Sequence, residues 1–218
     1  MRVVVVGAHG RTGIKIVEQL VAAGDGVVAT IRDPRQMADM VKRGAETVIL
    51  DLEASTGPDF ATQFKGADAV VFAAGSGTGE SSEIDSKGVR KTLRAAEKVG
   101  VRRYVAISSI GASTGMRLSG DWATDEMKDY YKHKRLAGKA IMNSGLDWTI
   151  VEPGELTDGK GTGKVTLSLE AIPPRSVSRA DVAAVVVAAL KAPKTVHKAL
   201  QLTSGKTAIA DAIKALGK

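Results

Sequence analysis

The sequence contains no cysteine. This absence excludes a disulfide framework, a zinc site built on thiolates and a cysteine nucleophile, and it is compatible with a reducing compartment. The histidines His9, His133 and His197 are too dispersed in the sequence to predict a metal site. We therefore expect a fold that depends on its hydrophobic core and a function that needs no metal.

Aromatic residues are also scarce, at 4% of the chain, and they do not alternate with basic residues in the pattern that stacks on nucleic-acid bases. The basic residues that give the net charge of +7 are dispersed among acidic residues. They predict a solvated surface that also favours an anionic cofactor, and we disfavour nucleic acid as a partner. No apolar run reaches the roughly 18 to 20 residues that span a bilayer, and no signal-peptide pattern precedes the first strand. We expect a cytoplasmic protein without a membrane partner.

The most informative segment that is present is Gly-Ala-His-Gly-Arg-Thr-Gly at residues 7–13, between the apolar run 3–6 and the amphipathic stretch 14–21. A buried parallel strand is a continuous β-branched run, and the turn after it must let the backbone approach a phosphate on the next helix. The spacing is GxxGxxG instead of the common GxGxxG, but this context predicts a dinucleotide site over a merely structural turn. The residues expected to contact the cofactor here are Gly7, His9, Gly10, Arg11, Thr12 and Gly13.

Strand-like and helix-like segments then alternate as in βαβ units. Further strands are predicted at 27–32, 47–50, 69–73, 103–108 and 148–152, and helices after Asp33, at 82–99 and at 125–144. After residue 154 the alternation falters, with an extra strand at 164–169, a helix at 179–191, a late strand at 200–203 and a short final helix. We predict a single α/β domain over 1–218, a Rossmann-type doubly wound parallel sheet with a small C-terminal elaboration and minimal substrate-side elements within 154–178.

In such a sheet, ligands bind beyond the carboxyl ends of the strands. The predicted loops at these ends are polar or rich in glycine. They contain Arg32, Asp51 with Leu52, the segment 73–77, and Ser108 with Ser109.

The residue at the end of the second strand predicts which nicotinamide cofactor binds. A carboxylate there would accept hydrogen bonds from the ribose of NAD, whereas an arginine would pair with the 2′-phosphate of NADP. Arg32 occupies this end, and Arg11 can approach the same phosphate. Asp33 is interpreted as the N-cap of the helix that Pro34 begins. The sequence thus predicts NADP in preference to NAD.

Tyr130 and Lys134 are four residues apart on a predicted helix, and so share one face, where the ammonium can favour the ionised phenol. With Ser109 to hold a carbonyl or hydroxyl oxygen, these groups could supply acid/base catalysis while a nicotinamide carries the hydride. Tyr131 competes with Tyr130 as the exposed phenol, and Ser108 with Ser109. Only one residue of each pair is expected to face the cofactor.

These motifs, in this order, resemble those of short-chain dehydrogenases/reductases of the atypical NmrA-like or epimerase/dehydratase-like branch, including compact bacterial NAD(P)-binding oxidoreductases. The resemblance covers most of the chain, through the glycine loop, 32–34, 51–52, 73–75, 104–109, Tyr130 with Lys134, 153–154 and 179–183. It implies that Asp51 and Leu52 lie by the adenine, Ala74 and Gly75 by the cofactor ribose, Pro153 and Gly154 near the nicotinamide, and that Lys134 holds the nicotinamide ribose as well as tuning Tyr130.

The chain departs from this family where a substrate lobe would be. Only about 60 residues follow Gly154, which argues against a nucleotide-sugar substrate, and Glu152 stands where relatives often have arginine. The segment 111–122 is interpreted either as a lid or as a plain surface loop. Asp181 is interpreted as a cap or an anchor of its helix start.

Two functions from different classes remain. The first is an NADP-dependent oxidoreductase or epimerase that acts on a small carbonyl or hydroxyl compound, as a monomer or homodimer. The second is a catalytically silent NADP-binding redox sensor.

Overall fold

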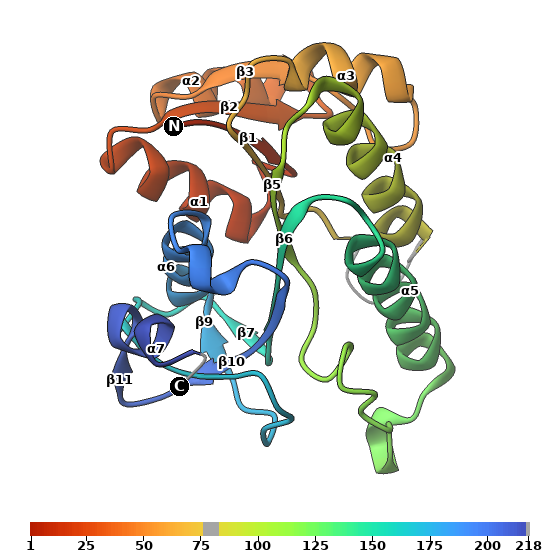
Figure 1. The fold of residues 1–218 in the computed structure, drawn as a ribbon, viewed down its shortest axis with the longest axis vertical. Helices are drawn as coiled ribbons and strands as arrows, with labels where there is room; N and C mark the ends of the chain where they lie inside the picture. The colour runs from red at the N-terminus through yellow and green to blue at the C-terminus, as the bar shows by residue number, and fades with distance from the viewer. Residues whose placement is uncertain (76–82, 217–218) are drawn as a thin grey trace.

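The computed structural model describes residues 1–75 and 83–216, in which strands alternate with helices (Figure 1). The strands are β1 (Arg2–Val6), β2 (Gly26–Ile31), β3 (Glu46–Ile49), β4 (Ala69–Phe72), β5 (Arg103–Ile107), β6 (Asp147–Pro153), β7 (Leu156–Thr157), β8 (Lys164–Ser168), β9 (Val177–Ser178), β10 (Lys198–Ser204) and β11 (Thr207–Ala208). The α-helices are α1 (Arg11–Ala22), α2 (Met37–Lys42), α3 (Gly57–Phe64), α4 (Glu83–Val99), α5 (Asp125–Met142), α6 (Arg179–Leu190) and α7 (Ile209–Ala215), and short 3-10 turns lie at Pro34–Gln36, Gly120–Trp122 and Pro193–Thr195.

The strand order of the main sheet is β11-β8-β10-β6-β5-β4-β1-β2-β3. β1 pairs in parallel with both β2 and β4, so the chain builds outward on one side of β1 and then on the other. The carboxyl end of this switch point is where a doubly wound sheet binds its ligand. The expected Rossmann-type fold is confirmed. Its C-terminal elaboration adds β10 in parallel to β6, β8 antiparallel to β10, and β11 beside β8.

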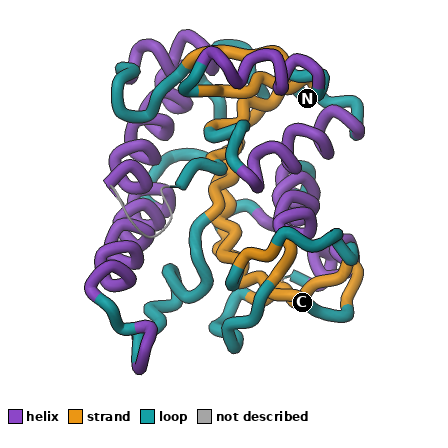
Figure 2. Tube along the Cα trace, turned by 180° about the vertical axis from the view of Figure 1, so that it is seen from behind, coloured by secondary structure: helices purple, strands orange, loops and turns teal. Residues whose placement is uncertain are grey.

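Helices cover both faces of the sheet, with α1 and α6 on one face and α3, α4 and α5 on the other (Figures 1 and 2). β1 shows why the sequence produces this arrangement. Val3 and Val5 contribute to the core on the α1 side, and Val4 and Val6 to the core on the α4 side. Because successive side chains point to opposite faces, a strand covered on both sides must be apolar throughout. None of the helices in the described ranges is long and apolar enough to cross a membrane.

Most predicted elements agree with the observed ones to within one or two residues wherever both ends are described. Two differ more: α1 begins at Arg11, three residues before the predicted amphipathic stretch, and the helix predicted after Asp33 begins as the 3-10 turn Pro34–Gln36, with α2 following from Met37. Ser82, at which the sequence predicts the start of the helix 82–99, lies outside the described residues. The sequence pattern did not predict α3, because the residues at its start are typical of turns. Thr56 accepts a hydrogen bond from the Asp59 amide, and the Asp59 carboxylate accepts one from the Thr56 amide. This reciprocal cap satisfies the first turn of a short helix that the hydrophobic pattern alone does not reveal.

Candidate cofactor and active site

The three glycines of the β1–α1 turn have different structural roles. Gly7 has a φ of +80°, and a Cβ atom there would lie 2.7 Å from the Ala74 backbone. At Gly13 a Cβ atom would lie 2.2 Å from the carbonyl oxygen of Gly7. These two glycines are therefore required for the turn itself. Gly10 is less confined, because the nearest atom to a Cβ there would be the Gly7 oxygen at 3.2 Å.

Gly10 is also the N-cap of α1, and no side chain of the described residues caps this helix. The N–H groups of the first turn therefore have no side-chain acceptor and point out beyond the helix start, where the helix dipole favours an anion. The adjacent Arg11 is exposed, and its Nη1 lies 3.4 Å from Asp158. The start of α1 has N–H groups that no described side chain caps, and Gly10 leaves space beside them. This arrangement fits a pyrophosphate.

The end of β4 lies against this turn. Ala74 contacts Gly7, and a Cβ atom on the neighbouring Gly75 would lie 3.4 Å from Asp85 Oδ1 and 3.6 Å from Lys134 Nζ. The fold thus brings the glycine turn, the β4 loop and the Lys134 side chain together at the carboxyl edge of the sheet. Ser76 and Gly77, which the sequence assigns to the same loop, lie outside the described residues.

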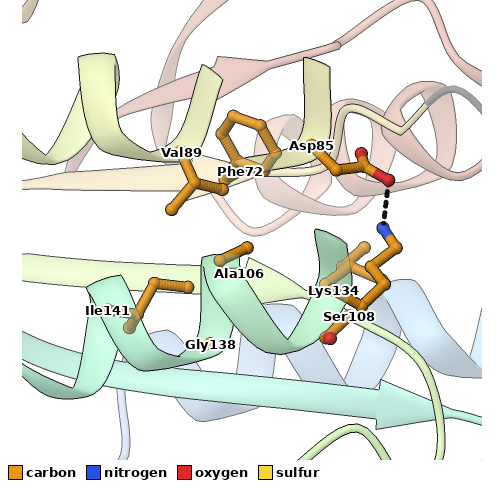
Figure 3. A pocket seen from close by; sticks show the side chains of 10 residues that line it. Phe72, Asp85, Val89, Ala106, Ser108, Lys134, Gly138 and Ile141 are labelled. Atoms are coloured by element: carbon orange, nitrogen blue, oxygen red, sulfur yellow. Dashed lines mark ion pairs between the residues drawn. The ribbon is translucent and has the colours of Figure 1, made fainter. Parts of the chain in front are cut away.

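Lys134 forms a buried ion pair with Asp85 of α4, with Nζ 3.1 Å from Oδ2 (Figure 3). The two side chains are 8% and 1% exposed. Burial disfavours the ammonium, but Tyr130 and Asp85 outweigh burial and raise the pKa of Lys134. Its charge is therefore retained at neutral pH.

A cavity of ≈ 10 Å³ lies beneath this ion pair, between α4, α5 and the sheet. It has space for about one water molecule, so a dinucleotide would have to lie outside it. Ser108, Asp85 and Lys134 form its polar end, and side chains such as Phe72 and Ile141 form the rest (Figure 3). The Ser108 hydroxyl is buried without a hydrogen-bond partner in the described part of the chain.

The two adjacent tyrosines have different environments. Tyr131 is 2% exposed, and its hydroxyl donates to the Ile110 carbonyl at 3.0 Å and accepts from Ser109 Oγ at 3.3 Å. Burial raises the pKa of the Tyr131 phenol. Tyr130 is partly exposed, and Lys134 Nζ lies 5.3 Å from the centre of its ring. Tyr130 is therefore the phenol that lies open beside the lysine.

The far end of the site lies at β2. Arg32 is exposed there. Asp33 accepts a hydrogen bond from the Arg35 amide and caps the turn that Pro34 begins, as the sequence predicts. The Arg35 guanidinium also binds this carboxylate and lowers the pKa of Asp33 to about 2. Asp33 is thus engaged by its own turn, whereas Arg32 extends from the end of the strand.

Other predicted contacts are spread along the same edge. The Asp51 carboxylate accepts from the amides of Glu53 and Ala54 and shapes the turn after β3. Leu52 lies against Gly88 of α4. His9 lies in the glycine turn, where its Nε2 is 3.3 Å from Asp39, and Thr12 is buried in the first turn of α1.

Pro153 and Gly154 follow the end of β6, next to the serine loop. The Pro153 carbonyl accepts from the Ile110 amide at 2.9 Å, and a Cβ at Gly154 would lie 1.9 Å from the Arg175 oxygen. Asp181 binds the amides of Thr162 and Gly163 beside the start of α6. The N-cap of α6 is Ser178, whose hydroxyl donates to the Asp181 carboxylate at 2.9 Å. Asp181 therefore anchors the helix start, as predicted, but does not cap it.

Sequence reasoning missed Asp85. A signal was present, because Asp85, Val89 and Leu93 recur every four residues along α4, and Val89 and Leu93 are core residues. A carboxylate on the apolar face of a helix requires a buried partner. The partner is Lys134, which lies 49 residues later in the chain and could not be named from this pattern.

Residues 7–193 match the NAD(P)H-binding family, and the chain belongs to it. It is 35% identical to YhfK of Bacillus subtilis, described as an uncharacterized sugar epimerase, over 99% of this chain and 100% of that protein. A solved structure from Bacillus halodurans, whose name places it among NAD-dependent epimerases/dehydratases, is 36% identical with a TM-score of 0.89 over 99% of this chain and 100% of that one. The oxidoreductase ylbE from Lactococcus lactis is 29% identical, with a TM-score of 0.85 over 99% and 96% of the two chains. The family is thus NAD(P)-binding and oxidoreductase- or epimerase-like.

Proposed function

We propose that this protein is an NADP-dependent oxidoreductase or epimerase-like enzyme of the short-chain dehydrogenase/reductase type, acting on a small carbonyl or hydroxyl compound. The observation that carries the proposal is the position of Tyr130 and Lys134. They lie beside each other, and Lys134 also lies against Gly75 next to the glycine turn. An acid/base pair is thereby combined with a dinucleotide site.

Residues along the carboxyl edge would hold the cofactor. The first turn of α1 would bind the pyrophosphate through its N–H groups. Arg32, supported by Arg11, would pair with the 2′-phosphate, which is why NADP is preferred over NAD. The bound nicotinamide supplies hydride transfer. The other residues assigned to the cofactor are Gly7, His9, Gly10, Thr12, Gly13, Asp51, Leu52, Ala74, Gly75, Ser108, Lys134, Pro153 and Gly154.

The chemistry of the substrate would fall to three side chains. Tyr130 donates or accepts the proton at the substrate oxygen, since its phenol is the open one of the pair. Lys134 holds the cofactor ribose and supplies the positive charge beside this phenol. Ser109 orients the substrate oxygen. The segment 154–178 supplies the remaining substrate contacts, and its small size favours a small substrate.

One observation favours the second candidate, a redox sensor that binds NADP without turnover. Ser109 donates its hydrogen bond to the buried Tyr131. In the enzyme, the Ser109 hydroxyl has to release Tyr131 and turn to the substrate. A sensor would need no such change.

Turnover of NADPH with a panel of small aldehydes, ketones and quinones tests the proposal. With an active substrate, Tyr130→Phe should remove most of kcat at nearly unchanged NADPH affinity, because it deletes a hydroxyl that acts mainly in the transition state. Lys134→Ala should weaken both turnover and NADPH binding. NADPH binding without turnover of any member of the panel would support the sensor instead.

Tyr131→Phe is the matched control for the catalytic tyrosine. It removes a hydroxyl from the adjacent phenol, whose hydrogen bonds are to Ile110 and Ser109. We expect this variant to lose stability and to retain more turnover than Tyr130→Phe. The reverse ranking would assign the proton transfer to Tyr131, and full rate in both variants would contradict a catalytic tyrosine.

A further inference from the structure

Glu152 is a buried carboxylate to which the proposed function assigns no role. It lies near the end of β6 and is 1% exposed. Its direct neighbour across the sheet is Gln201 of β10, which is 0% exposed. Burying a carboxylate is costly unless hydrogen bonds compensate it. The partners of Glu152 should therefore indicate why it is there.

All the hydrogen bonds to Glu152 come from neutral donors. The Ser113 amide donates to Oε1 at 2.9 Å, and the Ser113 hydroxyl donates to Oε2 at 2.9 Å. The Gln201 side-chain amide also donates to Oε2. The oxygen of the same Gln201 amide accepts from the Gly111 amide at 2.8 Å. Glu152 and Gln201 thus bind two backbone amides of the segment that follows Ser109.

The segment 108–116, which contains Ser109, is held by hydrogen bonds along most of its length. The Ser108 amide donates to the Val151 carbonyl and the Ile110 amide to the Pro153 carbonyl, so pairing with the β6 chain continues beyond β5. Beyond Ile110, the side chains of Gln201 and Glu152 accept from the Gly111 and Ser113 amides, in place of backbone carbonyls of the β6 chain. Arg135 donates to the Met116 carbonyl at 2.6 Å and holds the far end. The part of the loop after Met116 extends away from the body of the protein (Figure 1).

We infer that Glu152 is a positioning residue which, through Ser113 and Gln201, fixes the segment 108–116 and thereby places Ser109 where its hydroxyl can turn from Tyr131 to the substrate. This inference rests on the proposed function, because it gives Ser109 a substrate to orient. Because Glu152 is 1% exposed, we assign it no contact with substrate or cofactor. It acts on the backbone of Ser113 directly and on that of Gly111 through Gln201. These residues flank Ala112, which lies three residues beyond Ser109.

The network predicts an unusual response to Glu152→Gln. The new amide has one oxygen for donors that now reach both carboxylate oxygens. Its nitrogen faces the Gln201 nitrogen if it takes the Oε2 position and the Ser113 amide if it takes the Oε1 position, so two donors face each other in either case. If Gln201 flips, its nitrogen faces the Gly111 amide, and two donors face each other there. Either orientation leaves one amide unsatisfied, which is costly when buried.

Adding Gln201→Glu should repair this defect. In the double variant, the amide at position 152 accepts from the Ser113 amide and donates to the carboxylate at position 201. The Ser113 hydroxyl, whose oxygen lies 3.3 Å from the present Gln201 nitrogen, donates to the same carboxylate. The other oxygen of that carboxylate accepts from Gly111. Every donor regains an acceptor, and the single buried charge moves to the neighbouring strand.

Thr195→Val is the matched control. Thr195 is 0% exposed and lies on the opposite face of the sheet, where its hydroxyl accepts from Arg103 and donates to the Ala189 carbonyl. The substitution keeps the shape of the side chain and removes a buried hydroxyl. It should therefore lower stability without affecting the segment 108–116.

The experiment measures amide hydrogen exchange across 108–116, kcat and KM for an active carbonyl substrate, NADPH affinity and Tm in all four proteins. In Glu152→Gln we expect exchange of Gly111 and Ser113 to accelerate about tenfold, as for one lost hydrogen bond. We expect kcat to fall about 10- to 100-fold from the displaced serine, at unchanged NADPH affinity. The double variant should recover both, and Thr195→Val should change neither.

Three results would overturn the inference: unchanged exchange in Glu152→Gln, accelerated exchange with full kcat, or an equal loss of kcat in Thr195→Val at equal Tm. Absence of turnover in the unmodified protein would instead contradict the proposed function. In that case hydrogen exchange alone decides whether Glu152 anchors the segment, and acceleration reversed by Gln201→Glu supports the anchor.

Discussion

Removing one partner of the buried Lys134–Asp85 pair should cost more stability than removing both. Lys134→Met replaces the lysine by an apolar chain and leaves the Asp85 carboxylate, 1% exposed, without a cation. An uncompensated buried charge costs about 3–5 kcal/mol. The carboxylate can escape this cost by binding a proton, but protonating an ordinary aspartate at pH 7 itself costs about 4 kcal/mol. Both routes give a similar loss.

At about 2–4 °C per kcal/mol for a domain of this size, Tm should fall by about 6–20 °C. Lys134→Met with Asp85→Leu should instead lie within about 1.5 kcal/mol of the unmodified protein, because the double variant has no stranded charge. The lining of the neighbouring cavity by Phe72 and Ile141 provides an apolar environment for the new side chains.

The assay is urea unfolding of the cofactor-free variants at pH 7 and pH 5, which separates this effect from any role in binding NADP. The loss in Lys134→Met should shrink at pH 5, since protonation of the stranded carboxylate becomes easier as the pH falls. A loss below about 1 kcal/mol at pH 7, or a double variant less stable than the single one, would refute the reasoning.

Three further predictions concern other residues. The Gly10→Ala variant should fold and bind NADPH at least about tenfold more weakly. The Gly13→Ala variant should instead destabilise the fold, because its Cβ would lie 2.2 Å from the Gly7 oxygen. Circular dichroism measures folding and fluorescence titration measures binding, and normal NADPH binding by Gly10→Ala would place the phosphate elsewhere. Arg32→Ala should narrow the preference for NADPH over NADH by about 1.5–3 kcal/mol, and equal affinities in the unmodified protein would contradict the assignment. Burial raises the pKa of Glu152 above its ordinary 4.5. Above pH 4.5 the folded protein therefore retains a proton that the unfolded chain has lost. The free energy of unfolding should fall as the pH rises from 4.5 through the higher pKa that Glu152 has in the folded protein. Glu152→Gln should lack this slope, and parallel Tm curves for the two proteins between pH 4 and pH 8 would disprove it.

Sequence reasoning was most successful where the signal is local. Val3–Val6 and the glycines after them are contiguous, and they predict a strand, a turn and a helix start without knowledge of the rest of the chain. The order of such units then predicted the sheet. The turn at Asp33 could likewise be interpreted from neighbouring residues.

The site could be predicted only in part, since its side chains are placed by distant contacts. Tyr130 and Tyr131 are adjacent on a helix, and the choice between them depends on the buried acceptor that the Ile110 carbonyl supplies to Tyr131. Glu152 and Gln201 are 49 residues apart and meet only because β10 returns beside β6. No local pattern contains that register.

The position of β10 also has a consequence for the order in which the site is made. The glycine turn, the β4 loop and the Lys134–Asp85 pair are complete in a chain that ends before residue 198. Gln201 lies on β10, which pairs in parallel with β6 and comes late in the chain, before the short strand β11. Because chains are made from the N-terminus at about 5–20 residues per second, the glycine turn and the Lys134–Asp85 pair can form on the ribosome while the serine segment still lacks one of its anchors. A nascent chain would then form the phosphate-binding turn and the lysine site before the segment that holds Ser109 is fully anchored.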